Sequence, residues 1–354
     1  MTNKKVFVAM SGGVDSSVAA ALLKQQNYEV VGVHMKCYNV DGCAEQDAED
    51  ARRAAGVLGV PFYVFDFEEA YKDKVVEYMV AGYRQGITPN PDVMCNKEIK
   101  FGLFLEKALS MGADYIATGH YVKLTSDGNN HRLAIAADKN KDQSYFLWTL
   151  IQDQLKRCLF PLGDYQKSEV RNIAKKFGLP NADKKDSQGV CFLGQVTLED
   201  FLQDYIPAKQ GAVIDAAGQK LGEHNGAHFY TIGQRHGLGI AGKQPYYVAE
   251  KNVKKNTVIV ASGNEAPELF RKEVTIGDVN LINPVAFDSS RPLATRVRIR
   301  YRQPLVKAEL FKLKVGSYKL VFAEPLKFIA LGQSAVFYDA KGIMLGGGVI
   351  KSAS

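Results

Sequence analysis

The chain has no apolar run approaching the roughly 20 residues that a membrane-spanning helix needs. Its first residues lead directly into an apolar strand-like segment, which leaves no room for a signal or transit peptide. None of its five cysteines forms a C-x-x-C pair, so a zinc ribbon is disfavoured. Internal repeats and low-complexity segments are also lacking. We therefore expect a cytoplasmic protein with reduced thiols and no membrane partner.

At 354 residues the chain is too long for one ordinary core, and two or three domains are expected. A hydrophobic content of 46% and a charged content of 23% are typical of a soluble globular protein. The formal net charge of +7 modestly favours a polyanionic partner such as nucleic acid.

Residues 1–205 alternate strand-like and helix-like segments, which predicts an α/β domain with a doubly wound parallel sheet. The expected strands are Lys5–Met10, Glu29–Val33, Phe62–Asp66 and Tyr115–Thr118. The expected helices are Asp15–Gln25, Ala44–Leu58, Lys97–Ser110 and Lys167–Phe177.

Two small β-rich domains are expected to follow, at 206–272 and 273–354, where short β-branched or aromatic runs alternate with glycine turns. The strands expected in the central domain are Ala212–Asp215, His228–Ile232, Tyr246–Glu250 and Val258–Ala261. The last domain is predicted to be a small antiparallel β-barrel. Its expected strands are Val274–Val279, Ala294–Tyr301, Lys307–Leu313, Tyr318–Phe322, Ser334–Tyr338 and Met344–Ile350.

The segment Ser11–Ser17 predicts a nucleotide-pyrophosphate site, because it joins a buried strand to a helix through two glycines. Such a turn aims backbone N–H groups and a positive helix end at one point. Serine hydroxyls add donors, and Asp15 is a candidate ligand for the magnesium that accompanies a polyphosphate. The segment is neither a Walker A loop nor G-x-G-x-x-G. It resembles the PP-loop of the ATP pyrophosphatase superfamily, whose members split ATP between the α and β phosphates and adenylate a substrate oxygen.

A second motif spans Thr88–Lys97, where Pro89 and Pro91 indicate a stiff loop. Asn96 is expected to cap a helix beginning near Lys97. Cys95 would then lie beside a helix N-terminus, where the pKa of a thiol falls and thiolate is favoured. Asp92 is a candidate general acid or base. The competing interpretation of Cys95 is a buried inert thiol, the commoner fate of a single cytosolic cysteine.

A third motif places Cys191 between Gly189 and Gly194, after a polar run, which predicts a loop. A loop that brings Cys191 to Cys95 would make a two-thiol device. One thiol would carry sulfur as a persulfide and the other would resolve the bond by thiol–disulfide exchange. Of the remaining cysteines, Cys37 and Cys43 are interpreted as structural or incidental, and Cys158 is expected to be buried.

Together these motifs resemble the tRNA-specific 2-thiouridylases, the MnmA family of tRNA-uridine 2-sulfurtransferases, over essentially the whole chain. The resemblance extends to these further segments: Ala117–Tyr121, Lys141–Leu147, Tyr230–Arg235, Gly237–Ile240, Arg300–Arg302, Gly332–Tyr338 and Leu345–Ile350.

The resemblance implies ATP-dependent 2-thiolation of the wobble uridine of the Lys, Glu and Gln tRNAs, with AMP and pyrophosphate released. Cys191 would carry the persulfide, Cys95 would act as the nucleophile that leaves a transient Cys95–Cys191 disulfide, and Asp92 would handle protons. Sulfur would arrive from a sulfur-relay or cysteine desulfurase protein. The implied ATP-binding residues are Ala9, Met10, Ser11, Gly12, Gly13, Val14, Asp15, Ser16, Met35 and Gly119. The implied tRNA or target-base contacts are Asn90, Pro91, Asp92, His120, Lys141, Asp142, Gln143, Arg300, Tyr301 and Gln333.

The segment Thr295–Arg302 alternates arginine with apolar residues. In a strand this puts Arg296, Arg298, Arg300 and Arg302 on one face. Glu309 is the only acidic residue between Arg291 and Lys314, so a phosphate-binding surface is favoured over an ordinary solvated face.

Three alternatives stay open at the level of sequence. Asp92, Cys95 and Cys191 could ligate an iron–sulfur cluster with one open iron, although such clusters usually have all-cysteine ligation. The chain could be a PP-loop ligase that forms an amide or argininosuccinate, or a nucleotide-regulated RNA-binding protein without catalysis. His224 and His228 have the spacing of a helical metal pair, but Asn225 and Gly226 argue against a helix, and both are interpreted as loop residues.

Overall fold

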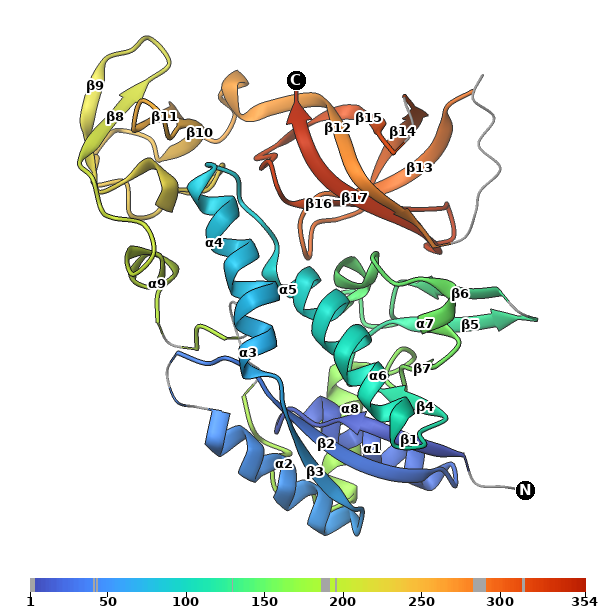
Figure 1. Ribbon diagram of the computed structural model, residues 1–354. Coiled ribbons are helices and arrows are strands. Elements are labelled where there is room, and N and C mark those ends of the chain that lie inside the picture. The colour runs from blue at the N-terminus through green and yellow to red at the C-terminus, as the bar shows by residue number, and fades with distance from the viewer. Residues whose placement is uncertain are drawn as a thin grey trace.

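The computed structural model describes residues 4–40, 42, 44–128, 130–185, 192–194, 196–282, 291–313 and 316–354. A parallel sheet with its helices lies at the bottom of Figure 1, and two long helical rods rise from it. The rods reach a small β-domain at the upper left and a closed barrel at the upper right. Within the described ranges, no helix combines the length and the apolar character needed to cross a membrane.

The N-terminal sheet has five parallel strands in the order β3-β2-β1-β4-β7. Its strands are β1 (Lys5–Ala9), β2 (Glu29–Lys36), β3 (Phe62–Asp66), β4 (Tyr115–Ala117) and β7 (Cys158–Leu159). Helices α1 (Val14–Gln25), α2 (Ala44–Leu58) and α8 (Lys167–Lys176) accompany it. Alternate β1 side chains enter two cores: Val6 and Val8 pack with α1 and α8, and Phe7 and Ala9 pack with Phe104. The predicted doubly wound fold is therefore confirmed.

Two long helical rods carry the segment between β3 and β4. The first runs through α3 (Glu68–Tyr71), a π-helix η1 (Lys72–Val76) and α4 (Glu77–Arg84). The second runs through α5 (Pro91–Met94), a π-helix η2 (Cys95–Leu103) and α6 (Phe104–Ser110). The expected helix start at Lys97 is wrong. Pro91 occupies the first turn, where its missing N–H costs nothing, and the Asn90 side chain caps the helix by accepting from the Val93 N–H at 3.2 Å.

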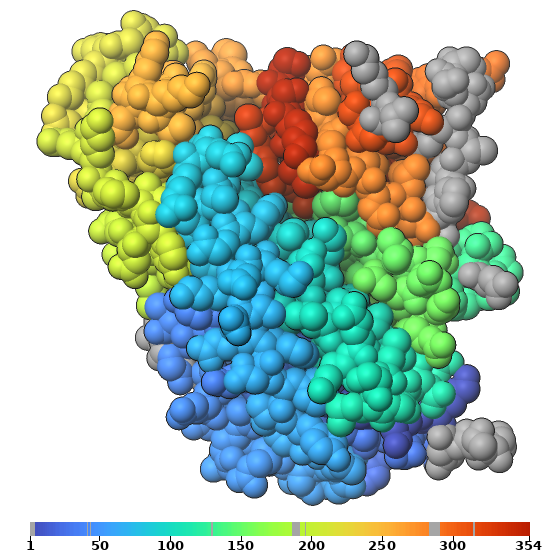
Figure 2. All heavy atoms as spheres, in the orientation of Figure 1, coloured from blue at the N-terminus to red at the C-terminus, as the bar shows by residue number. Residues whose placement is uncertain are grey.

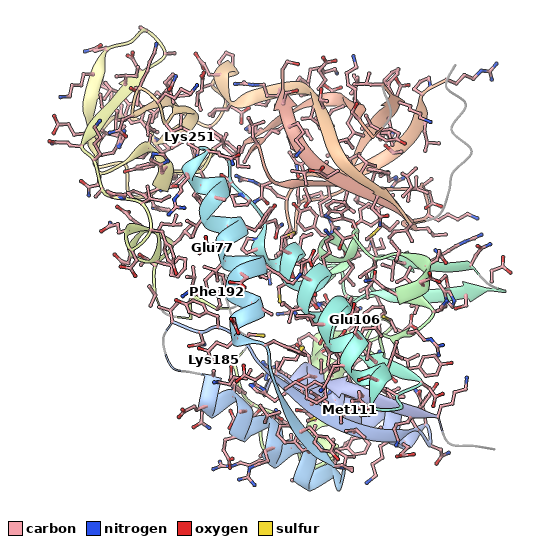
Figure 3. The ribbon with its side chains drawn as sticks, viewed as in Figure 1. Glu77, Glu106, Met111, Lys185, Phe192 and Lys251 are labelled. Atoms are coloured by element: carbon pink, nitrogen blue, oxygen red, sulfur yellow. The ribbon has the colours of Figure 1, made fainter. Side chains whose placement is uncertain are left out.

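The central β-domain has the strand order β10-β11-β8-β9. Its strands are β8 (Gly211–Asp215), β9 (Lys220–His224), β10 (Tyr246–Asn252) and β11 (Thr257–Ser262). The expected strand His228–Ile232 is wrong, because a 3-10 turn, η4 (Ala227–Phe229), begins there and buries Phe229. His224 is also not a loop residue, since it ends β9. Helix α9 (Leu198–Gln203) precedes this domain, and Lys251 reaches across to the Tyr83 ring of α4 at 5.7 Å (Figure 3).

The C-terminal domain is a closed barrel in the order β12-β15-β14-β13-β16-β17, as predicted. Its strands are β12 (Phe270–Leu281), β13 (Leu293–Arg298), β14 (Val306–Lys312), β15 (Tyr318–Lys327), β16 (Ser334–Tyr338) and β17 (Met344–Ala353). Val297, Leu310, Leu320 and Phe337 are fully buried inside it.

The barrel docks on the sheet domain through a connection that follows β4. This connection contains the hairpin β5 (Lys123–Asp127) and β6 (Asn130–Ala134), the 3-10 turn η3 (Ser144–Leu147) and helix α7 (Gln152–Leu155). Its Trp148 donates from Nε1 to Ser334 Oγ at 3.0 Å, and Asn280 Nδ2 of β12 donates to the Trp148 carbonyl at 2.7 Å. The two domains thus share an apolar core that includes Tyr145, Trp148 and Tyr338.

The expected arginine-lined face of one strand is wrong. Strand β13 ends at Arg298, and Arg302 lies beyond it with a φ of 63°. Arg296 is exposed, but Arg298 is buried between the domains and pairs with Asp142, Nη1 to Oδ2 2.6 Å. The Arg298 side chain is 8% exposed and that of Asp142 is 1% exposed. Arg298 therefore joins the barrel to the sheet domain instead of facing solvent.

We predict that Arg298→Ala destabilises the protein by about 3–5 kcal/mol, because it leaves the Asp142 carboxylate buried without its counter-charge. Arg296→Ala, two residues earlier on the same strand but exposed, should change stability by less than about 0.5 kcal/mol. Urea unfolding of the three proteins measures both effects. Equal losses from the two variants would contradict the assigned role of the Arg298–Asp142 pair.

Candidate functional site

The loop between β1 and α1 has the geometry of an anion cradle. Gly12 has a φ of +78° and lies so close to the Asp47 carbonyl that any side chain would overlap it. Gly13 is the N-cap of α1, so the helix directs its first N–H groups into the loop. The Ser11 N–H donates to Ser16 Oγ at 3.1 Å, and Ser16 Oγ donates to the Gly13 carbonyl at 3.1 Å. These bonds hold the predicted pyrophosphate loop in one conformation.

The end of β4 touches the same loop backbone to backbone. A Cβ on Gly119 would lie 2.7 Å from the Ser16 nitrogen, which only glycine avoids. The Met10 N–H, at the end of β1, donates to the Val33 carbonyl of β2 at 2.7 Å. The ends of these three neighbouring strands therefore meet at the loop, and β2 continues through Met35. This is the edge where ligands bind in open α/β sheets.

Asp15 at the start of α1 is held by two side chains that the sequence did not single out. Lys167 Nζ, from the first residue of α8, lies 2.8 Å from both Asp15 carboxylate oxygens. The Tyr121 hydroxyl donates to Asp15 Oδ1 at 2.8 Å. The Lys167 side chain is 12% exposed, so a lysine charge is built into the cradle. Lys167 lies in no motif, and Tyr121 lies in the segment Ala117–Tyr121 without an assigned role, because the approach of both to Asp15 depends on how α8 and the end of β4 pack.

A cavity of about 310 Å³ adjoins this loop. It is lined by Asp50, Arg53, Pro180, Asn181, Asp183 and Lys184. Asn181 Nδ2 donates to the Gly12 carbonyl and to Ser17 Oγ, both at 2.9 Å, so one wall of the cavity is bonded to the loop. Lys184 in turn pairs with Asp47 and Asp50 at 2.7 and 2.6 Å. The cavity is polar and carries charges of both signs.

Cys95 is buried in the second turn of its helix, at the first residue of η2. Burial raises the pKa of its thiol, and the neighbouring Asp92 charge acts in the same direction. The Lys100 charge and a hydrogen bond from Tyr71 lower the pKa but do not reverse the shift. The expected low thiol pKa is therefore wrong, because the helix starts at Pro91 instead of near Lys97, which puts Cys95 inside the helix, and because the sulfur is desolvated. Asn96 is no cap either, since its Nδ2 donates to the Asp92 carbonyl at 3.0 Å.

His120, expected at the tRNA surface, is buried behind the same helix. Its Nδ1 lies 2.7 Å from Thr118 Oγ1, and its ring lies 5.9 Å from that of Phe101. Burial, followed by the Lys100 charge, lowers the pKa of the imidazole well below its usual value. His120 is therefore neutral at physiological pH.

Cys191 and Cys43 lie outside the described residues, and the description resumes after Cys191 at Phe192. The Phe192 ring lies 5.7 Å from that of Tyr71, with the two planes at 68°. Its carbonyl accepts from the Val40 N–H at 3.2 Å. Phe192 and Cys95 belong to one apolar cluster, and Figure 3 shows Phe192 beside the first helical rod. Of the other cysteines, Cys158 is buried as expected, which raises its pKa, and Cys37 is half-buried.

Three domains meet at the segment that leads into this helix. The Thr88 N–H donates to the Leu331 carbonyl of the barrel at 2.7 Å. Gln333 Nε2 donates to the carbonyls of Thr88 at 2.9 Å and Pro89 at 3.2 Å. Thr88 Oγ1 donates to Thr231 Oγ1 of the central domain at 3.4 Å. We call residues 88–90 the strap, and Figure 2 shows α4, just before it, between the two β-domains.

Several expected tRNA contacts have partners within the protein. Asp142 pairs with Arg298, Gln143 Oε1 accepts from the Tyr121 N–H at 3.0 Å, and Gln333 holds the strap. Arg300 Nη2 donates to the Ile232 carbonyl of the central domain at 2.6 Å. The Tyr301 ring lies 4.6 Å from that of Phe146.

Among the described residues, no group of three or more His, Cys, Asp or Glu side chains is arranged to hold a metal ion. His224 Nδ1 accepts from the Gly226 N–H at 2.9 Å, and His228 Nδ1 lies 3.0 Å from the Tyr83 carbonyl. Both histidines are thus used in structural hydrogen bonds.

Family models match three consecutive parts of the chain. A tRNA methyl transferase HUP domain matches residues 4–195, a tRNA methyl transferase PRC-barrel domain matches 199–262, and an aminomethyltransferase beta-barrel domain matches 271–350. With the glycine loop and the closed barrel, these matches define a PP-loop enzyme that carries two accessory β-domains.

Curated relatives narrow this class. A tRNA-specific 2-thiouridylase MnmA of Listeria monocytogenes serovar 1/2a is 45% identical over 98% of this chain and 94% of its own. One from Staphylococcus epidermidis is 44% identical over 99% and 96%. The chain belongs to the tRNA-specific 2-thiouridylase MnmA family, which consists of sulfurtransferase enzymes.

Among solved structures, an NMN synthetase from Francisella tularensis aligns at 18% identity with a TM-score of 0.36, covering 56% of this chain and 71% of that one. A likeness this low carries no weight for function.

We predict that Gln333→Leu loosens the strap, because it leaves two carbonyls in the interface without their donor, a loss of about 1–3 kcal/mol. Amide hydrogen exchange should rise at residues 88–95 and stay unchanged in α1. Gln219→Leu, an exposed position of the central domain, serves as the control. Unaltered exchange in the Gln333 variant would show that the barrel does not hold this segment.

Proposed function

We propose that this chain uses ATP to replace the C2 oxygen of a tRNA wobble uridine by sulfur. The observation that carries the proposal is the glycine loop with Asp15 in the same domain as the Asp92–Cys95 helix. We also propose that residues 1–205 form the catalytic domain, and that residues 206–272 and 273–354 form two domains that position the RNA. The names of the relatives support tRNA as substrate, and the Lys, Glu and Gln tRNAs are the expected ones.

The first half-reaction is adenylation of the uracil C2 oxygen, which is otherwise a poor leaving group. The oxygen attacks the α-phosphate of ATP, and the bond to the β-phosphate breaks to release pyrophosphate. Residues Ala9 to Ser16 would form the phosphate site, in which the N–H groups at the start of α1 bind the phosphates, with Met35 and Gly119 near the adenosine.

Magnesium is the proposed cofactor of this step, where it would neutralise polyphosphate charge. Asp15 fits the role of ligand, because its carboxylate lies at the mouth of the loop and is 32% exposed. Lys167 would then pass from Asp15 to a phosphate oxygen.

The target base would lie against Asn90, Pro91 and Asp92. The capped start of α5 gives this pocket a rigid wall, and the Tyr145 hydroxyl hydrogen-bonds to the Asn90 side chain. Asp92 is half-buried, one helical turn before Cys95, within reach of a base bound there. We assign Asp92 the proton transfers that accompany activation of the base.

The second half-reaction transfers sulfur from a persulfide on Cys191. The terminal sulfur attacks C2, the C2–O bond breaks, and AMP leaves with the oxygen. The Cys95 thiolate then attacks the inner sulfur, and the electron pair of the S–S bond remains on the sulfur now attached to C2. The products are 2-thiouridine and a Cys95–Cys191 disulfide, which a dithiol reductant of the cytoplasm must reduce. A sulfur-relay or desulfurase protein would reload Cys191.

The proposed RNA surface includes the positions implied by the family, with roles adjusted to their contacts. Lys141 and Tyr301 are partly exposed and can reach RNA directly. His120, Asp142, Gln143, Arg300 and Gln333 would act on RNA through the segments they hold. The net charge of +7 supports a polyanionic substrate.

Replacing Cys191 by Ser should abolish 2-thiouridine formation, because serine cannot carry a persulfide, while tRNA-dependent AMP formation stays detectable. Mass spectrometry of digested tRNA and an AMP assay measure the two products. Cys158→Ser is the matched control at a buried thiol without a proposed role. Sulfur incorporation at the wild-type rate in the Cys191 variant would sink the persulfide mechanism.

Asp15→Ala should reduce pyrophosphate release by at least about 100-fold, since it removes the proposed metal ligand and leaves Lys167 without its partner. Asp73→Ala, an exposed aspartate on η1, should leave the rate unchanged. Pyrophosphate release at the normal rate in the Asp15 variant would refute the position of the ATP site.

An iron–sulfur cluster held by Asp92, Cys95 and Cys191 is the competing mechanism. Anaerobic purification followed by iron and persulfide analysis separates the two. Stoichiometric iron that is lost in Cys95→Ser would favour the cluster, and persulfide on Cys191 without iron would favour the route above.

A further inference from the structure

We propose that Tyr71 and Lys100 together support the thiolate of Cys95, Tyr71 as a hydrogen-bond donor to its sulfur and Lys100 as a fixed positive charge. This inference rests on the proposed function, in which Cys95 must react as a thiolate. Neither residue belongs to the pyrophosphate loop or to the target-base pocket. Lys100 is brought toward Cys95 by the π-helix η2, and Tyr71 by the packing of the two rods in one apolar cluster.

Lys100 owes its position to the π-helix η2. A π-helix pairs residue i with residue i+5, so Cys95 and Lys100 form the two ends of one π-turn. In a regular α-helix, residue i+5 would lie about 140° around the axis and point away from residue i. The π-turn thus brings the lysine toward the face that carries the thiol. π-Turns within α-helices are frequent at functional sites.

Tyr71 reaches the sulfur from the neighbouring rod, at the junction of α3 and η1. It is 2% exposed, and its hydroxyl is hydrogen-bonded to the Cys95 thiol. The Tyr71 ring packs against the ring of Phe192, with 5.7 Å between the two centroids. This contact helps to fix the position of the Tyr71 hydroxyl. A tyrosine hydroxyl donates to a thiolate but gains less from a thiol, so this bond favours the charged form.

Lys100 acts on two groups. Its charge lowers the pKa of Cys95 and also that of His120, and its side chain is half-buried. Because the His120 imidazole is neutral, it adds no second positive charge near Cys95. Lys74, on the adjacent π-helix η1, pairs with Glu98 at 3.4 Å and is committed to that contact.

Asp92 is the opposing charge on this rod, and its effect on the Cys95 thiol is unfavourable to thiolate. Burial acts in the same direction and is the largest influence. Tyr71 and Lys100 thus offset part of an environment that would otherwise keep the sulfur protonated. Lys100 acts through Cys95 and is a positioning residue, whereas Tyr71 touches the reacting atom.

The test measures the Cys95 thiol in the full-length protein without tRNA or ATP. Iodoacetamide reacts with thiolate, so the pH dependence of Cys95 alkylation, followed by peptide mass spectrometry, reports its apparent pKa. We expect Lys100→Met and Tyr71→Phe each to raise the midpoint by about one pH unit, which is about tenfold slower alkylation at pH 8. The rate at high pH, where thiolate is complete, should stay within about twofold.

Lys97→Met and Tyr83→Phe are matched controls, one an exposed lysine on the same π-helix and the other a buried tyrosine on the same rod as Tyr71. Both should leave the midpoint unchanged, and Lys100→Arg should restore most of it because it keeps the charge. An unchanged midpoint in Lys100→Met and Tyr71→Phe would overturn the proposal. A raised midpoint that Lys100→Arg fails to restore would also overturn it, since the charge would then not be the cause.

The result separates this inference from the proposed function. Alkylation reports the thiol whether or not the protein modifies RNA. Shifted midpoints combined with normal thiolation in Cys95→Ser would uphold the thiolate support and refute the assigned role of Cys95. Unshifted midpoints combined with lost thiolation in Cys95→Ser would refute the support of the thiolate by Tyr71 and Lys100 and would uphold the assigned role of Cys95.

Discussion

The strap is hydrogen-bonded by two β-domains at once, by the barrel through its backbone and by the central domain through the Thr88 hydroxyl, and these bonds hold the start of the Cys95 helix. Gln333 binds the carbonyls of Thr88 and Pro89, the Leu331 carbonyl binds the Thr88 N–H, and Thr231 binds its hydroxyl. Pro91 then begins the helix with its φ already helical, and Asn90 caps it. Because the strap enters the helix without a flexible joint, a shift of either β-domain moves the first helical turn with it. The barrel and the central domain therefore help to position the proposed catalytic helix.

The site combines two demands that conflict. In the proposed reaction Cys95 must react as a thiolate, but desolvation of its sulfur raises the pKa of the thiol and holds the proton on it. The surroundings of Cys95 resolve the conflict locally, with a hydroxyl and an ammonium, instead of by exposing the sulfur. A charged group is also balanced by a nearby partner at the proposed nucleotide loop. There the Asp15 carboxylate pairs with Lys167 at 2.8 Å. In the proposed reaction, a metal would take over Asp15 and a phosphate would take over Lys167.

Local signals predicted much of this structure. Helix Ala44–Leu58 and strands Phe62–Asp66 and Ser334–Tyr338 have the expected bounds, because their periodicity and their turn residues agree with their tertiary setting. The glycine loop was predicted for the same reason, since its positive φ and its close approach to Asp47 require a glycine at Gly12. The closed barrel followed from six short β-branched runs.

Tertiary partners decided the rest. Asn90 and Asn96 are both suitable caps by residue type, and Pro91 at the first helical position favours Asn90, which is the observed cap. The alternation of arginine with apolar residues in β13 correctly predicted a strand. It could not predict that Arg298 forms a buried ion pair with Asp142. Lys167 and Tyr71 carry no motif, because each becomes functional only through packing between elements far apart in the sequence. Cys191 remains a prediction.

The bonds at Gln333 also set an order of events during synthesis. The Gln333 carbonyl accepts from the Ile350 N–H and the Gly332 N–H donates to the Ile350 carbonyl, both at 2.9 Å, so the loop that grips the strap is itself fastened to the last strand. On a ribosome, the Cys95 helix emerges long before that strand does. A nascent chain therefore carries its nucleotide loop early and its anchored thiol only when the barrel closes. An incomplete chain would therefore lack the anchored Cys95 helix that the proposed sulfur transfer needs.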